Sequence, residues 1–90
     1  MFSGAKLFHM KTTHGVPLDV TLQVLKSKGI TVTWDKFIDE ARINKWWDFQ
    51  IVQYCTDSLG DAGYSTDDIS EIIQRMKLYI LQNEHPMMKK

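Results

Sequence analysis

The sequence has little of what disulfides, membrane insertion or long-range charge steering require. Cys55 is the single cysteine, which excludes an internal disulfide and fits a cytosolic protein. No apolar run reaches the length of a membrane span, and the first residues lack the apolar core of a signal peptide. Because 11 basic side chains balance 11 acidic ones, overall charge points to neither nucleic acid nor anionic membrane as a partner. We therefore expect a cytoplasmic protein without a membrane span.

The residues that carry chemistry are also sparse. The five glycines are scattered, so no phosphate-binding loop exists. His9 and His14 have neither cysteines nor paired carboxylates near them in the sequence, which is typical of surface or capping histidines rather than metal ligands. Cys55 falls on an apolar stripe with Ile51, which favours a buried structural thiol over a nucleophile. We expect no enzyme activity, no metal and no cofactor.

What is present is helical periodicity in a chain of ordinary globular composition. Ninety residues, 43% of them hydrophobic, suffice for one domain with a modest core. Apolar residues recur at helical spacing almost throughout. The sequence predicts a small all-α bundle of four to five short helices over residues 1–84 and a flexible tail over 85–90.

The stretch 13–21 carries the clearest turn. Gly15 can take a positive φ and end a helix, and Pro17 has a φ suited to a first helical turn. Asp19 would then meet the positive end of the helix dipole. The following helix would end at Gly29, with Ile30 placed for a Schellman ending.

Residues 3–41 contain the motif Gly15-Val16-Pro17-Leu18-Asp19, with Ser3-Gly4 before it, Phe8, Met10, Thr13, His14 and Thr21 around it, and Gly29 and Phe37 after it. Together these residues resemble a helical segment that follows the catalytic core of alanyl-tRNA synthetases. Lys11 and Thr12 depart from the Tyr and Asp usual there. Since the family's aminoacylation and editing sites lie in other segments, the resemblance implies a helical segment and not synthetase activity.

Three residues are predicted helix N-caps: Ser3, Thr33 and Ser65. The helix from Ser3 should reach about Thr12, and the helix from Ser65 should run from Thr66 to about Gln82. Between residues 34 and 59 the apolar face changes phase at Asn44-Lys45, which favours a break near Asn44. One continuous helix from Trp34 to Leu59 is the alternative.

The predicted core contains one large apolar residue per helical turn. Its members are Phe8, Leu18, Leu22, Leu25, Phe37, Ile51, Ile69, Ile73 and Met76.

Three tryptophans are many for a small chain and suggest a partner-binding surface formed by Trp34, Trp46 and Trp47. Adjacent helical positions point about 100° apart, so Trp46 and Trp47 cannot share one buried face. Trp47 is in phase with Ile51 and Cys55 and is predicted inside, with Trp46 outside. The leading hypothesis is an accessory or regulatory protein that binds a protein partner or a second copy of itself.

An RNA-binding accessory domain is the alternative hypothesis. The synthetase resemblance and the net +3 charge of residues 1–45 (seven basic, four acidic) favour it. Its phosphate contacts would be Lys6, Lys11, Lys26 and Lys28.

The stretch Thr33-Trp34-Asp35-Lys36-Phe37 is similar to stretches in small cytoplasmic accessory proteins of tailed bacteriophages, such as lysis-inhibition factors. This resemblance implies a regulator of lysis timing.

Overall fold

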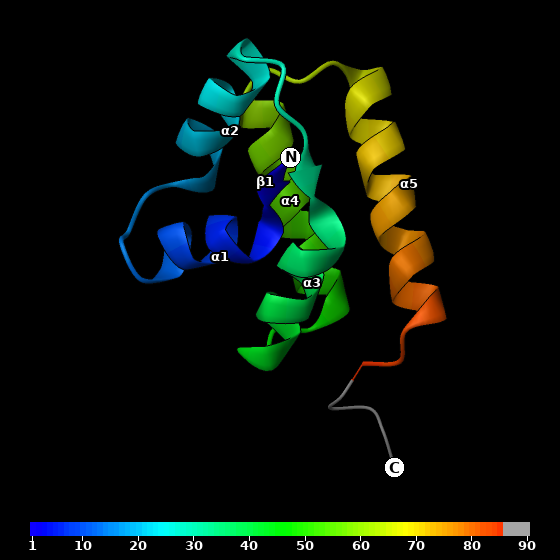
Figure 1. The fold of residues 1–90 in the computed structure, drawn as a ribbon. Helices are drawn as coiled ribbons and strands as arrows, with labels where there is room; N and C mark the ends of the chain where they lie inside the picture. Colours follow the sequence, from blue (N-terminus) through cyan, green and yellow to red (C-terminus); the bar gives the residue numbers. More distant parts are fainter. Residues whose placement is uncertain (86–90) are drawn as a thin grey trace.

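The chain folds into a bundle of five helices with one minimal strand pair (Figure 1), in a computed structural model that describes residues 1–85. In chain order the elements are β1 (Phe2–Ser3), α1 (Gly4–Thr12), α2 (Leu18–Ser27), β2 (Val32–Thr33), α3 (Trp34–Ile43), α4 (Asp48–Asp61) and α5 (Thr66–Gln82). The predicted all-α class is confirmed. Helix α5 packs along α4 and α3, while α1 packs against α3.

The strand pair joins the chain's beginning to the segment before α3. β1 and β2 run parallel with Phe2 opposite Val32, and the Phe2 N–H donates to the Thr31 carbonyl at 2.8 Å. Local sequence patterns do not predict this pairing, because its two partners lie thirty residues apart. Gly4 makes the approach possible, since a Cβ there would collide with the Thr33 carbonyl oxygen and the Phe37 amide nitrogen.

Two of the three predicted N-caps accept a hydrogen bond from the first turn of the helix that follows them. The Ser3 hydroxyl accepts from the Lys6 N–H at 3.3 Å, and the Ser65 hydroxyl accepts from the Asp68 N–H at 3.1 Å. Thr33 stands at the N-cap position of α3, but its hydroxyl accepts from the Gly4 N–H at 2.9 Å. Thr33 therefore caps α1 instead of α3, because β1 brings that helix start against it.

The turn between α1 and α2 has the predicted geometry. Gly15 has φ +68°, and Asp19 lies in the first turn of α2. Pro17 stands at the N-cap with φ −57°, one residue before the helix begins. At the far end of α2, Gly29 has φ +67° and the Ile30 N–H donates to the Leu25 carbonyl at 2.9 Å, which is a Schellman ending.

The break between α3 and α4 is confirmed, and the alternative of one long helix is wrong. The left-handed residue is Lys45, with φ +67°, and not Asn44, whose φ is −88°. The Lys45 N–H donates to the Arg42 carbonyl and the Trp46 N–H to the Ala41 carbonyl, at 2.9 and 3.0 Å. These two bonds are a second Schellman ending, with lysine where glycine is usual.

Eight of the nine predicted core residues are buried. The exception is Ile69, which is half-buried and packs against the core from the first turn of α5. Leu7, Ile38 and Leu59 are also fully covered.

Helix α5 has the predicted bounds, and the chain stays attached beyond it. We expected residue 85 to begin a flexible tail, but the His85 residue is only 3% exposed. Its Nε2 lies 2.8 Å from the Trp46 carbonyl oxygen. The rest of the expected tail, 86–90, lies outside the described residues.

Candidate partner-binding surface

The two adjacent tryptophans face opposite to the prediction. Trp46 is half-buried and packs edge-on against Phe8 and Tyr54, with ring centroids 5.5 Å away in both cases. Trp47 is 39% exposed and lies against the His85 ring at 5.5 Å. The predicted arrangement, with Trp47 inside and Trp46 outside, is wrong.

The reversal follows from the backbone between α3 and α4. Trp47 is the extended N-cap of α4, with φ −76° and ψ 152°, so the helical phase of Ile51 and Cys55 does not reach back to it. Trp46 occupies the position after the left-handed residue, where a Schellman ending usually carries an apolar side chain. Its indole packs against Phe8 of α1 and Tyr54 of α4, at the edge of the core.

The three tryptophans do not form one surface. Trp34, half-buried, packs against Phe37 at 5.7 Å and lines a groove between β2 and α5. Trp46 packs between α1 and α4. Trp47 lies at the start of α4, beside the residues that follow α5. Of the three, Trp47 presents the most open ring, which makes it the one best placed for a partner.

A larger apolar surface lies where α4 and α5 run side by side. Phe49 is 73% exposed and Leu81 is 81% exposed, and both line a shallow hollow of about 480 Å³. Val52 and Ile80 complete its apolar lining, while Asp48, Gln53 and Lys77 supply its polar lining. We call Phe49, Val52, Ile80 and Leu81 the α4–α5 surface. Exposed apolar residues gathered in this way are typical of interaction sites.

Sequence reasoning missed Phe49 and Leu81, although a signal was present. Both are off the phase of their helix's buried stripe, since Ile51 and Cys55 mark one face of α4 while Ile73 and Met76 mark one face of α5. Large apolar residues outside a buried stripe are the ones left exposed.

A buried ion pair fixes the end of the molecule beside this surface. The Arg42 guanidinium donates to both Asp48 carboxylate oxygens at 2.9 and 3.1 Å and to the Asn83 carbonyl at 2.8 Å. The Arg42 side chain is 4% exposed and that of Asp48 is 29% exposed. Arg42 thus joins α3, the start of α4 and the end of α5, which holds the two walls of the α4–α5 surface in register.

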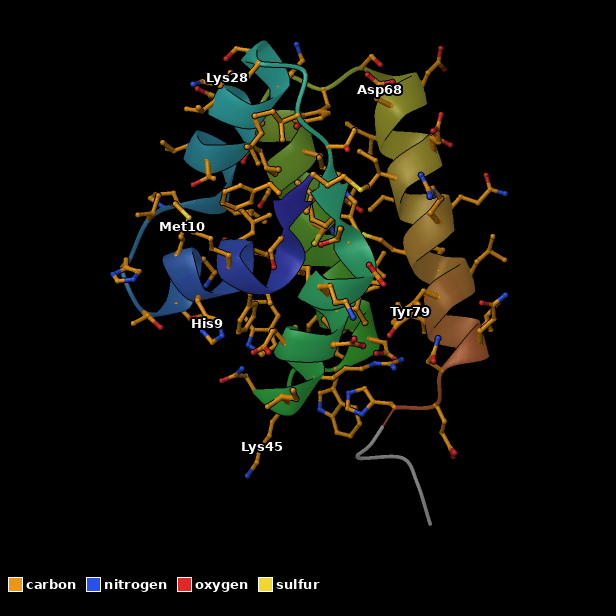
Figure 2. All side chains as sticks on the ribbon, in the orientation of Figure 1. His9, Met10, Lys28, Lys45, Asp68 and Tyr79 are labelled. Atoms are coloured by element: carbon orange, nitrogen blue, oxygen red, sulfur yellow. The ribbon has the colours of Figure 1, made fainter. Side chains whose placement is uncertain are left out.

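The four lysines of the RNA hypothesis are not brought together. Lys6 lies over the Phe2 ring at 5.6 Å, and the Lys11 Nζ lies 5.2 Å from the Trp46 ring and 5.0 Å from the Tyr54 ring. Lys26 and Lys28 are exposed at the end of α2, and Figure 2 shows Lys28 well apart from His9 and Met10 of α1, the helix that carries Lys6 and Lys11. Two of the four are therefore engaged with aromatic rings.

The side chains of the types most often used in catalysis are a buried thiol, two exposed imidazoles and a half-buried tyrosine hydroxyl. Cys55 is fully buried, and this burial raises the pKa of its thiol far above the usual value. His9 and His14 are exposed, as predicted, and His9 pairs with Glu40 at 3.1 Å. The Tyr79 hydroxyl donates to Asp39 at 2.6 Å, and this bond, helped by burial, raises the pKa of Tyr79 to about 12.

Over residues 1–85 the structure holds no group of three or more His, Cys, Asp or Glu side chains placed to bind a metal ion. In the same part of the chain, none of the helices combines the length and the apolar character needed to cross a membrane.

No protein-family model matches the chain, and no solved structure matches it. The resemblances to alanyl-tRNA synthetases and to phage accessory proteins stay predictions. The residues that carry the first are structural here. Gly15 and Pro17 shape the turn before α2, Gly4 permits the close approach of Thr33 and Phe37, and Phe8 and Phe37 are fully buried.

Proposed function

We propose that this chain is a small, non-enzymatic cytoplasmic accessory protein that acts by binding another protein or a second copy of itself through the α4–α5 surface. The carrying observation is the exposure of Phe49 and Leu81, at 73% and 81%, on two neighbouring helices around one hollow. Leaving two such side chains wet costs about 25 cal/mol per Å² of apolar area, so a partner that covers them gains that free energy.

Trp47 extends the proposed binding site. It lies two residues before Phe49 and keeps 39% of its surface exposed, while its other face lies on His85. A rigid, half-supported indole is a typical anchor at interfaces because little side-chain entropy is lost when it is covered. Arg42 and Asp48 keep this end of α4 fixed in the absence of a partner.

The test uses the double variant Phe49→Ala with Leu81→Ala. Its matched control is Ile43→Ala with Val24→Ala, since these residues are also exposed, at 70% and 50%, but lie outside the α4–α5 surface. Sedimentation equilibrium measures self-association, and affinity capture from the host lysate measures partner binding. We expect the double variant to weaken binding at least about tenfold while its melting temperature stays near that of the wild type. Equal binding by both double variants would contradict the proposal.

The finer proposal, a bacteriophage accessory factor that sets the time of lysis, rests on the likeness of residues 33–37. Producing the chain in a phage-infected culture tests it, with the Phe49→Ala and Leu81→Ala double variant as control. We expect the wild-type chain to shift the time of lysis and the variant to shift it less. An unchanged time with both would contradict this finer proposal and leave the binding surface to its own test.

A further inference from the structure

The last turn of α1 places an ammonium group over two aromatic rings at once. The Lys11 Nζ lies 5.2 Å from the centroid of the Trp46 ring and 5.0 Å from that of the Tyr54 ring. Both distances are within the range of about 6 Å over which a ring face attracts a cation. The two ring centroids are 5.5 Å apart and the ring planes meet at 78°, so the rings form a corner. We call Trp46 and Tyr54 the aromatic corner.

The ring faces, rather than an ion pair, hold this ammonium. Within residues 1–85, Lys11 forms no ion pair with a carboxylate. Asp19, in the first turn of α2, adds a negative charge at longer range. Burial raises the pKa of the Tyr54 hydroxyl, and the charge of Asp19 raises it further, so this carboxylate acts on the corner. The corner therefore combines two ring faces with a nearby negative charge, as a site for a cation requires.

The corner is a fixed feature of the fold and remains open to solvent. The Trp46 ring packs edge-on against Phe8 at 5.5 Å, and Phe8 is fully buried, so the indole has a rigid support. Lys11, Trp46 and Tyr54 are all half-buried, which leaves the corner accessible from outside. Lys6 of the same helix offers a contrast, since it is exposed and its Nζ lies over a single ring, that of Phe2, at 5.6 Å.

A quaternary ammonium suits the corner better than the lysine does. A primary ammonium is compact and strongly hydrated, so it must give up hydration to approach a ring face. A trimethylammonium group has the same charge, and its methyl groups contact both ring faces; aromatic sites of this kind are its usual receptors. Lys11 lies in the last turn of α1 on a flexible side chain, so its ammonium can leave the corner while the helix stays formed.

We propose that the aromatic corner binds a trimethylammonium group and that Lys11 occupies the corner until this ligand displaces it. The group can belong to a free small molecule or to a trimethylated lysine side chain. This site is separate from the α4–α5 surface, because Tyr54 follows Val52 by two positions, which is about 200° around α4. The proposed function uses neither Lys11 nor Tyr54.

Choline is the first probe, titrated into the isotope-labelled chain and followed by the indole N–H NMR signals. Its matched control is the neutral analogue in which carbon replaces the quaternary nitrogen. We expect choline to shift the Trp46 signal and to leave that of Trp34 unchanged, and the neutral analogue to bind at least about fivefold more weakly. An acetylated and amidated tripeptide with trimethyllysine between two glycines is titrated in parallel, and tighter binding than that of choline would identify a modified protein as the source of the group.

Two lysine variants test the occupant of the corner. Lys11→Ala and Lys6→Ala remove the same charge from the same helix, but only the first frees the corner. Lys11→Ala should bind choline at least about fivefold more tightly than the wild type, and Lys6→Ala should stay within about twofold of it.

Two further variants, made together with Lys11→Ala, test the ring face. Tyr54→Leu removes the face and should weaken choline binding at least about fivefold, whereas Tyr54→Phe keeps the ring and should change it by less than about twofold. Circular dichroism establishes that each variant is folded. The neutral analogue and the two lysine variants decide the proposal without the Tyr54→Leu protein if that variant does not fold.

Any of four results would overturn the inference. They are no shift of the Trp46 signal in Lys11→Ala up to about 50 mM choline, equal binding of the neutral analogue, equal shifts of Trp34 and Trp46, and equal affinities of Lys11→Ala and Lys6→Ala. None of them bears on the α4–α5 surface, whose test uses Phe49 and Leu81.

Discussion

The junction after α2 and the junction after α3 share one backbone geometry and differ in what covers it. Gly29 and Lys45 both have φ +67°, and the next residues, Ile30 and Trp46, donate N–H groups back to Leu25 and Ala41 at 2.9 and 3.0 Å. Ile30 remains 37% exposed, whereas Trp46 packs between Phe8 and Tyr54. A left-handed lysine costs about 1 kcal/mol more than a left-handed glycine. At the second junction, packing of the following aromatic residue offsets that cost.

The second junction, after α3, is also held by more side-chain hydrogen bonds than the first. Arg42 bonds Asp48 and the end of α5 there, whereas the corresponding polar contact of α2 is one bond from the Tyr64 hydroxyl to the Leu22 carbonyl at 3.3 Å. The comparison teaches that a helix ending without glycine is stable where tertiary contacts fix the residues around it.

The largest expected effect is a loss of stability on substitution of Trp46, in contrast to Ile30, the corresponding residue after the other left-handed position. Trp46→Ala should lower the free energy of unfolding by about 3 kcal/mol, because it empties a space between Phe8 and Tyr54. Ile30→Ala and Trp47→Ala should each cost about 1 kcal/mol or less, since both side chains are exposed. Urea denaturation measures all three. A larger loss for Trp47→Ala than for Trp46→Ala would contradict the packing described for this junction.

Removal of the polar attachment should have the next largest effect. Arg42→Met keeps most of the side-chain volume but leaves Asp48 and the Asn83 carbonyl without their donor. We expect a loss of about 2 kcal/mol, below the range for a fully buried pair because Asp48 is 29% exposed. Tyr64→Phe, which removes the single bond to α2, should cost about 1 kcal/mol or less. Equal losses of unfolding free energy in Arg42→Met and Tyr64→Phe would contradict the stronger polar attachment described for the second junction.

Substitutions at the two left-handed residues, Lys45→Gly and Gly29→Ala, should change the stability of the fold in opposite directions. Lys45→Gly should stabilise the fold by about 0.5–1 kcal/mol by relieving the backbone. Gly29→Ala should destabilise it by about 1 kcal/mol through the backbone alone, since a Cβ there meets no atom within 4 Å. Thermal unfolding of both variants measures this, and a loss of stability in Lys45→Gly would mean that the lysine side chain contributes more than its backbone costs.

The smallest effect is a pH dependence at the α3–α5 contact. The Tyr79 pKa is raised to about 12 by its bond to Asp39, above the ordinary value of 10.0. Because the folded state holds this proton more tightly, the contribution is fully present below pH 10 and is lost as pH rises toward 12. Tyr79→Phe should therefore lose less stability between pH 9.5 and 11 than the wild type does, as followed by urea midpoints. Parallel curves for the two proteins would show that this contact is not formed in solution.

Local signals in the sequence predicted most of the fold. Ser3 and Ser65 were identified as caps because a short hydroxyl side chain bonds its own helix start, which requires no distant partner. Gly15, Gly29 and the periodic stripe of α5 are local in the same sense. The predicted core residues follow from the same periodicity, and among them Ile69 alone is half-buried.

The candidate surface could be predicted only in part. Of the three tryptophans predicted to bind a partner, Trp47 lies two residues before Phe49 and is part of the proposed site. The side chains that dominate it, Phe49 and Leu81, lie far apart in the sequence and become neighbours only when α4 and α5 pack side by side. Thr33 is a similar case, since its hydroxyl caps α1 only after β1 pairs with β2.

The sequence by itself determined which segments are helical, where most of them begin and end, and which side chains form the core, because these depend on contacts within about one helical turn. The tertiary structure alone decided which of two adjacent indoles is covered, what Arg42 and His85 bind, and where exposed apolar side chains gather. Those outcomes depend on the path of the backbone through Lys45, and on contacts between residues that are dozens of positions apart. Helical periodicity does not predict which way a side chain faces across a left-handed residue. The chain changes direction at that residue, and the next helix starts with a new phase.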